Sequence, residues 1–207
     1  KVEVITELVN IFEKDKFQEE VEKTIGKAAK ADKIASRTAK HISEKMEEDP
    51  AFYKKFSQML QDTISEYEAN RINETIYLNR VRELMNNVLA HTDSDIPEEL
   101  KDKDVAKAFY GLCVESLSEN IQDDIVRRKI SAQAAISIDL LIQKAVLDTN
   151  RPIIDWQYKT NITGKLQIEI GDYLIDEVRD KYHLNLSFAD MDEIANKCIE
   201  VAKIRYR

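Results

Sequence analysis

The side chains that could hold a metal ion or act as a nucleophile are few and widely separated in this sequence. The histidines are His41, His91 and His183, and the cysteines are Cys113 and Cys198. A structural zinc site needs four such ligands, usually in closely spaced pairs. Because neither cysteine has a histidine at such a spacing, we expect no zinc site and no cofactor bound by this chain. Two distant thiols in helical patterns are expected to be buried and reduced.

One local run of possible oxygen ligands extends from His91 to Asp95. If a calcium loop began at Asp93, its twelfth position would be Asp104. However, Pro97 occupies the fifth position, where an oxygen ligand is needed, and Glu98 the sixth, where the turn needs glycine. We therefore interpret this segment as an acidic connection between helices.

Motifs for nucleophilic catalysis and for phosphate binding do not occur in the sequence. No serine lies in a Gly-x-Ser-x-Gly turn, and no Gly-x-x-x-x-Gly-Lys-Ser/Thr or Gly-x-Gly-x-x-Gly loop is present. The 39 carboxylates will form pairs by chance, mostly on solvated helix faces. We predict that this chain is not itself an enzyme and that its role is to bind a partner.

Two groups of basic side chains have the spacing of a contact surface. The first recurs at intervals of three and four residues, which aligns it along one helix face. The second is a run of three consecutive cations. The groups are Lys27, Lys30, Lys33, Arg37 and Lys40, and Arg127, Arg128 and Lys129. Each is a candidate contact for an acidic protein surface or for DNA, and the alternative for each is an ordinary solvated face.

The elements that position these residues are predicted to be helices. The chain has 4 Gly and 3 Pro, and apolar residues recur at helical spacing along most of it. We predict an all-α bundle of about seven to nine helices with antiparallel hairpins and little or no strand. The expected helical segments are 2–12, 17–25, 27–48, 50–69, 74–90, 105–117, 120–148, 162–178 and 188–201. Met59, Ile76 and Ile125 are expected on buried faces, and the short alternation from Leu166 to Ile170 is read as helix.

Helix boundaries can be read from capping residues. Asp49 before Pro50 has the pattern of an N-cap followed by the first helical position. The stretch 70–73 is short enough to make its flanking helices an antiparallel hairpin. Asn150-Arg151-Pro152 ends another helix, since proline disfavours a helical residue before it. Ser187 to Asp190 resembles a capping box that opens the last helix.

We expect residues 1–207 to form a single helical domain that is a fragment of a longer chain. A polar break near 93–103 allows a subdivision into N-terminal helices, 1–92, and C-terminal helices, 104–207. The net charge of −8 and the pI of about 5.1 argue against nucleic acid as the main ligand. No apolar run approaches the ~20 residues of a membrane span, so no membrane contact is expected. Two reduced thiols suit a cytosolic setting, and a cytoplasmic location is predicted.

Three strings occur in this order along the chain: Lys55–Leu60, Val105–Tyr110 and Ile153–Trp156. Together they resemble the C-terminal helical domain of the restriction (R) subunits of type I restriction-modification enzymes. The second string is similar to that domain's apolar Ala-Phe-Tyr segment, and the third to its Ile-Asp-Trp signature. The opening segment Val4–Phe12 fits the junction after the motor. One departure is Asp180–Leu184, where the family often has a basic stretch and a Gly-Tyr-Pro-Pro-like turn.

The resemblance implies a division of labour within a larger enzyme. The parent subunit would be an ATP-dependent DNA translocase and endonuclease that uses ATP and Mg²⁺ in domains N-terminal to this segment. The helical domain would dock the motor subunit on the methyltransferase and specificity subunits of the same system. An auxiliary role in guiding translocated DNA along the basic helix is the alternative.

Overall fold

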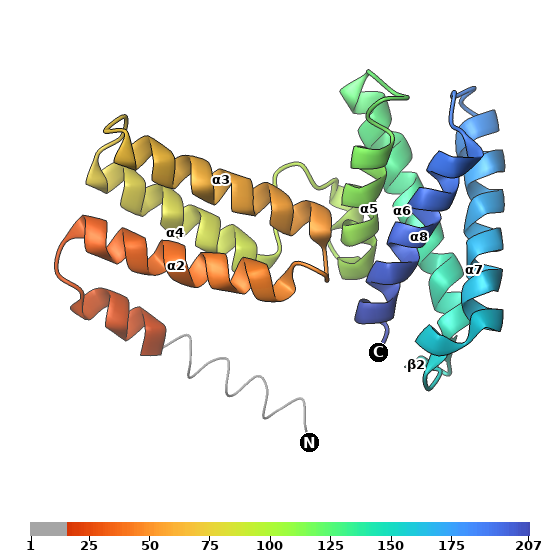
Figure 1. Cartoon of the computed structure of the whole chain (residues 1–207), viewed down its shortest axis with the longest axis horizontal. Helices are drawn as coiled ribbons and strands as arrows, with labels where there is room; N and C mark the ends of the chain where they lie inside the picture. Colours follow the sequence, from red (N-terminus) through yellow and green to blue (C-terminus); the bar gives the residue numbers. More distant parts are fainter. Residues whose placement is uncertain (1–15) are drawn as a thin grey trace. The chain divides into compact units, whose positions relative to one another are not determined.

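The computed structural model describes residues 16–207, and this part of the chain is almost wholly helical (Figure 1). A helical stretch covers residues 16–23. The α-helices that follow are α2 (Lys27–Lys45), α3 (Pro50–Glu68), α4 (Glu74–Ala90), α5 (Asp104–Ser116), α6 (Asp124–Val146), α7 (Thr160–Tyr173) and α8 (Phe188–Arg205). The prediction of an all-α bundle is confirmed. The helix expected over 2–12 lies outside the described residues.

Short elements connect these helices. They are the 3-10 helices η1 (Glu98–Leu100) and η2 (Trp156–Tyr158), the π-helix η3 (Leu174–Asp180), and the strands β1 (Leu147–Asp148) and β2 (Arg151–Pro152). The two strands pair antiparallel, Leu147 opposite Pro152. Among the described residues this hairpin is the whole of the β-structure, and the alternating Leu166–Ile170 is helical, as predicted.

The chain divides into two compact units. The first contains the described residues up to Glu44 together with Lys55–Thr92, and the second contains Lys45–Lys54 together with Asp93–Arg207. The longer part of the second unit therefore begins at Asp93, the first residue of the polar segment 93–103. It also includes the connection between α2 and α3 and the first turn of α3, which a division read along the sequence assigns to the N-terminal helices.

In the first unit, α2, most of α3, and α4 run side by side (Figure 1). The rings of Tyr67 and Tyr77 stack with their centroids 4.4 Å apart, which joins α3 to α4. The Tyr77 hydroxyl donates to Asp32 at 3.0 Å and so joins α4 to α2. The apolar side of α2, including Ile34 and Ile42, is buried.

Residues with left-handed backbone conformations end several helices. At the end of α3, Asn70 has φ 56°, its N–H donates to Tyr67 and that of Arg71 donates to Glu66. This pair of backbone hydrogen bonds is a Schellman motif. It ends α3 and allows the predicted antiparallel hairpin with α4. His91 and His183 have φ values of 49° and 53° at the equivalent positions after α4 and η3. These two histidines therefore terminate helices.

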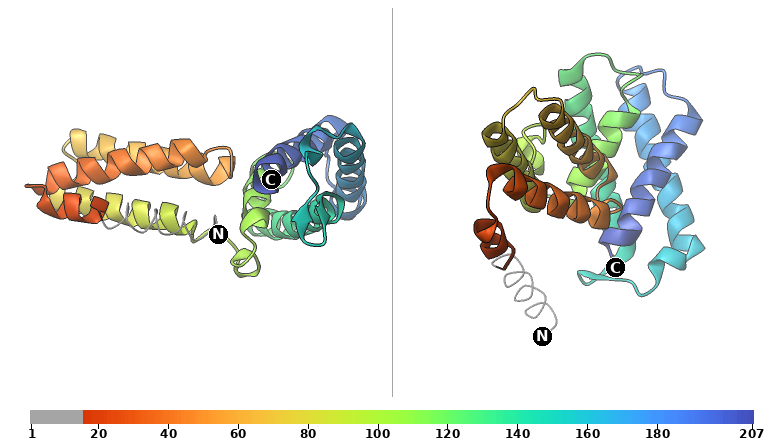
Figure 2. Two further views of the ribbon diagram at one scale, coloured as in Figure 1. Left: turned by 90° about the horizontal axis from the view of Figure 1, so that it is seen from below. Right: turned by 60° about the vertical axis from the view of Figure 1, so that its left-hand side comes forward.

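The second unit is built from α5, α6, α7 and α8, which surround a shared apolar core (Figure 2). Trp156, Phe109 and Ile138 are completely buried there. Cys113 and Cys198 are buried and form no disulfide, as predicted. The predicted caps are present: Asp49 accepts from the Phe52 N–H, and Ser187 forms a capping box with Asp190.

Three residues expected on buried faces are instead exposed. Ile125 is 80% exposed because α6 begins at Asp124, capped by Asp123, and not near residue 120. Ile125 therefore lies in the first turn, beyond the end of the core. Met59 and Ile76 are each 41% exposed, at the edges of otherwise buried stripes. No helix among residues 16–207 has both the length and the apolar character needed to span a membrane.

Candidate functional site

A turn after the β-hairpin presents two apolar side chains to solvent. Thr149 and Asn150 both have positive φ, as a type I′ hairpin turn requires, so the chain reverses tightly after α6. The Ile153 N–H then donates to the Val146 carbonyl at 2.8 Å, which ties the returning chain to the end of the helix. The following turn leaves Ile154 82% exposed.

The same turn continues through η2 to Tyr158, which is 85% exposed. Asp155, between the two exposed residues, adopts φ 56°, a left-handed conformation that turns the chain toward the core. Trp156 follows and is completely buried. A buried anchor is thus placed between two exposed apolar residues, Ile154 and Tyr158.

Tyr206, just after α8, holds this turn in place. The Trp156 indole N–H donates to the Tyr206 carbonyl at 2.6 Å. The Tyr206 hydroxyl donates to Asp139 of α6, and the Gln143 side-chain amide donates to the other Asp139 oxygen at 2.9 Å. Burial raises the pKa of Asp139, and burial together with this carboxylate raises the pKa of the Tyr206 hydroxyl.

A surface groove of about 1410 Å³ lies beside the turn, entirely within the second unit. Its lining comes from three parts of the unit. We call the residues of α8 from Asn196 to Ile204, together with Arg207, its floor. We call the other two parts its walls: the segment from Pro152 to Tyr158, and the group that includes Pro50 of α3 and Leu112 of α5. We call this feature the α8 groove.

The connection before α3 is fixed against the end of α8 by ionic contacts. Arg205 forms an ion pair with Asp104 at the start of α5 and a longer one, 3.7 Å, with Glu48. In addition, a Cβ atom placed on Gly111 of α5 would lie 2.6 Å from the Ala51 Cβ. The first turn of α3 therefore approaches α5 as closely as glycine allows, which shapes that wall of the groove.

Charges of the two signs are balanced in the α8 groove. Lys203 pairs with Glu200 at 2.7 Å within the groove, and Lys197 pairs with Glu193 at 2.7 Å. The charged lining residues are Lys54, Lys197, Lys203 and Arg207, and Glu47, Glu115, Asp155 and Glu200. With four cationic and four anionic side chains, the lining of the groove has a formal net charge of zero.

The first predicted basic group lies along α2 in the first unit. We call Lys27, Lys30, Lys33, Arg37 and Lys40 the α2 stripe. Lys27 donates to the Thr75 hydroxyl at 2.8 Å, and Lys33 and Lys40 form ion pairs of 3.3 and 3.7 Å with nearby glutamates. The Arg37 guanidinium lies 5.8 Å from the centre of the Phe17 ring. Most of the stripe is therefore engaged in contacts within its own unit.

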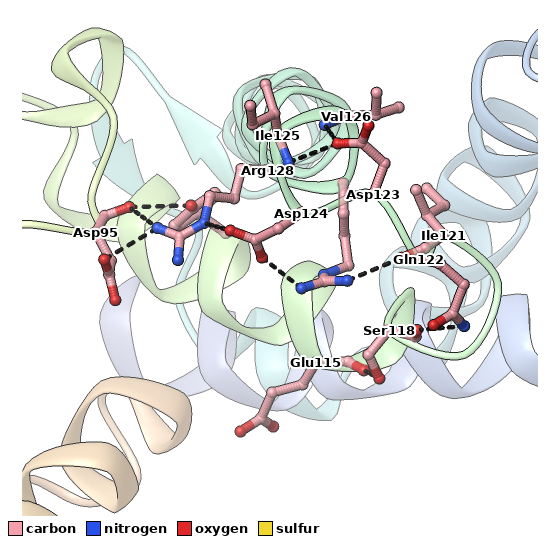
Figure 3. A network of polar contacts seen from close by, with 12 residues as sticks. Asp95, Glu115, Ser118, Ile121, Gln122, Asp123, Asp124, Ile125, Val126 and Arg128 are labelled. Atoms are coloured by element: carbon pink, nitrogen blue, oxygen red, sulfur yellow. Dashed lines mark hydrogen bonds and ion pairs between the residues drawn. The ribbon is translucent and has the colours of Figure 1, made fainter.

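The second predicted basic group lies in the first turns of α6, in the other unit. Arg128 contacts Asp124 at 2.7 Å and Asp95 at 3.1 Å, and these carboxylates raise its pKa (Figure 3). Arg127 also pairs with Asp124 and donates to the Ile121 carbonyl at 2.8 Å. The pairing anchors the acidic connection to α6. Lys129 is exposed.

The two basic groups thus belong to different units, and the structure describes no single site that contains both. Lys33 and Lys40 of the first group and Arg127 and Arg128 of the second form ion pairs with neighbouring acids. Within residues 16–207, no group of three or more histidine, cysteine or acidic side chains is placed to hold a metal ion.

The residues of the α8 groove were not singled out from the sequence as a site. The available signal was local: the two isoleucines after Pro152 stand outside any helical or alternating pattern. In the sequence, Ile153 and Ile154 stand out only as part of the string that resembles restriction subunits. The polar lining residues of α8 could not be recognised as a site from the sequence, because charged and polar residues on one helix face are typical of any solvent-exposed helix.

Comparisons with known proteins give no relative for this chain. No family model, no curated protein and no solved structure matches it.

Proposed function

We propose that this chain is a protein-interaction domain whose contact surface is the α8 groove. The observation that supports this most strongly is the pair Ile154 and Tyr158, which are over four-fifths exposed yet held beside the groove by the buried Trp156. Covering such a side chain contributes roughly 1.5–3 kcal/mol. Because the turn is already fixed by hydrogen bonds, little ordering entropy opposes that gain.

We further propose that the partner is the methyltransferase–specificity core of a type I restriction-modification system. The support is the resemblance of the three strings, one of which, Ile153–Trp156, forms a wall of the groove. In this proposal the chain docks a restriction subunit on that core. ATP-dependent translocation and DNA cleavage would belong to other domains of the parent enzyme.

The alternative function is weak DNA binding along the α2 stripe. The observation in its favour is that Lys27, Arg37 and Lys40 remain exposed on one helix. Against it stand the acidic partners of Lys33 and Lys40 and the net charge of −8. A phosphate-binding surface gains its affinity from cations that are available to release counterions.

Co-purification of the untagged methyltransferase–specificity core with the tagged chain tests the proposal. We expect a stable complex whose affinity changes little between about 50 and 200 mM salt, because few net charges are neutralised. Binding of duplex DNA, with a steep loss over the same range, together with no capture of the core, would favour the alternative. Absence of both complexes would contradict both functions.

A further inference from the structure

We infer that the α8 groove receives a single amphipathic helix of the partner, about three turns long and of near-zero net charge. This inference rests on the proposed function, since it names the kind of segment that the groove would bind. It is carried by three properties of the groove: its length, the placement of its apolar residues, and its balanced charge.

The length follows from α8. The lining residues Asn196, Glu200, Lys203 and Arg207 fall on successive turns of its C-terminal half and just beyond it. With a rise of 1.5 Å per residue, the distance from residue 196 to residue 207 is about 16 Å. A partner helix of about eleven residues, or three turns, covers that length.

The apolar residues that a partner can reach lie on the floor and on one wall. Ile204 is on the floor and Ile154 and Tyr158 are on the wall, whereas Val201 and Leu112, 3% and 5% exposed, are buried beneath the lining. An extended strand offers apolar side chains only on alternate residues and would also need a sheet edge to pair with. Among the residues that the structure describes, the only strand in the lining is the two-residue β2, through Pro152 on one wall, and the floor is a helix. A helix with apolar residues at positions i, i+3 or i+4, and i+7 matches these surfaces.

The balanced charge selects the composition of that helix. A DNA backbone would face Glu47, Glu115, Asp155 and Glu200, which repel phosphate. A strongly basic or strongly acidic peptide would likewise meet like charges on one part of the lining. A segment that carries one or two charges of each sign beside its apolar face avoids these penalties.

Site-specific photocrosslinking on the intact chain tests the inference. Tyr158 is replaced by p-benzoyl-phenylalanine, the chain is mixed with the methyltransferase–specificity core and irradiated, and crosslinked peptides are sequenced by mass spectrometry. We expect one core peptide with apolar residues at helical spacing and a net charge between about −1 and +1. Because Tyr158 is 85% exposed, we expect the variant to keep the fold, and circular dichroism checks this.

Several outcomes would overturn the inference. If the core is captured but crosslinks only from a matched probe at Ile168 on α7, which is 65% exposed and outside the groove, the inference fails while the proposed function stands. A crosslink to a highly charged or non-helical core segment, to DNA, or to a second copy of this chain also contradicts it. If the core is not captured at all, the proposed function and the inference fail together.

Discussion

The indole nitrogen of Trp156 lies 2.6 Å from the carbonyl oxygen of Tyr206, so the turn after β2 and the residue that follows α8 are joined by a direct hydrogen bond. The Tyr206 hydroxyl extends the connection to Asp139 of α6. The hydrogen bond thus joins the wall of the α8 groove that contains Trp156 to the residue that follows α8, the helix that forms the floor. This rigidity allows Ile154 and Tyr158 to remain in defined positions although solvent surrounds them.

Removing the Tyr206 hydroxyl should weaken the second unit. In Tyr206→Phe, the buried Asp139 loses one of its two hydrogen-bond donors, and we expect the free energy of unfolding to fall by about 1–3 kcal/mol. Trp156 is the only tryptophan, so urea unfolding followed by its fluorescence reports on this region. Tyr158→Phe is the matched control, with a change within about 0.5 kcal/mol. Equal stabilities of the two variants would refute the role of the hydroxyl.

The close approach of α3 and α5 makes Gly111 sensitive to substitution. Gly111→Ala places a methyl group against Ala51, and we expect a loss of about 1–3 kcal/mol that exceeds the gain in helix propensity. Gly171→Ala, in α7 with no atom near its added Cβ, should stabilise the protein by up to about 1 kcal/mol. Thermal unfolding measures both, and Ala51→Gly should restore much of the loss in Gly111→Ala. A stabilised Gly111→Ala variant would show that the helices are not in contact.

Asp139 should make stability depend on pH in a definite direction. Burial raises its pKa in the folded state above that of the unfolded chain, so the folded state binds the proton more tightly. Its contribution to the free energy of unfolding therefore rises as the pH falls through the folded-state pKa and levels off below the unfolded value. Asp139→Asn should remove this rise, as measured by urea unfolding of both proteins from about pH 7 to pH 4. Parallel pH profiles would exclude a raised pKa at this residue.

Arg128 should matter for stability and not for partner binding. Arg128→Met removes contacts to Asp95 and Asp124 while keeping much of the side-chain volume, and partial exposure limits the expected loss to about 1 kcal/mol. Lys129→Ala, at an exposed neighbouring position, should change nothing. Thermal unfolding gives the stability, and capture of the methyltransferase–specificity core gives the binding. Loss of capture at unchanged stability would make the α6 cations a contact surface after all.

Local signals in the sequence were sufficient for most helices and their ends. The Asp49 cap, the Ser187 capping box and the short connection after α3 each involve residues within a few positions of one another. Their geometry depends on backbone preferences that a short stretch already contains. The boundary of α6 was misplaced by about four residues because Ile121 continues the apolar spacing although it precedes the cap at Asp123.

The candidate site depends on contacts between distant positions, and these could not be read along the chain. Asp95 and Arg128 are 33 residues apart, yet their pairing turns an apparent basic surface into a structural contact. Similarly, the bond between Trp156 and Tyr206 spans 50 residues and converts a short apolar string into one wall of a groove. The absence of catalytic and phosphate-binding motifs led to the prediction of a binding role, but only the fold brings the groove residues together.

The affinity of the Ile154→Asp variant for the methyltransferase–specificity core tests the central proposal most directly, by isothermal titration calorimetry against Ile168→Asp as a control of similar exposure. If the α8 groove is the docking site, a charge at residue 154 should raise Kd at least about tenfold, and the same change at residue 168 should leave it within about twofold. Equal affinities of the two variants and the unaltered chain would contradict a docking role for the groove.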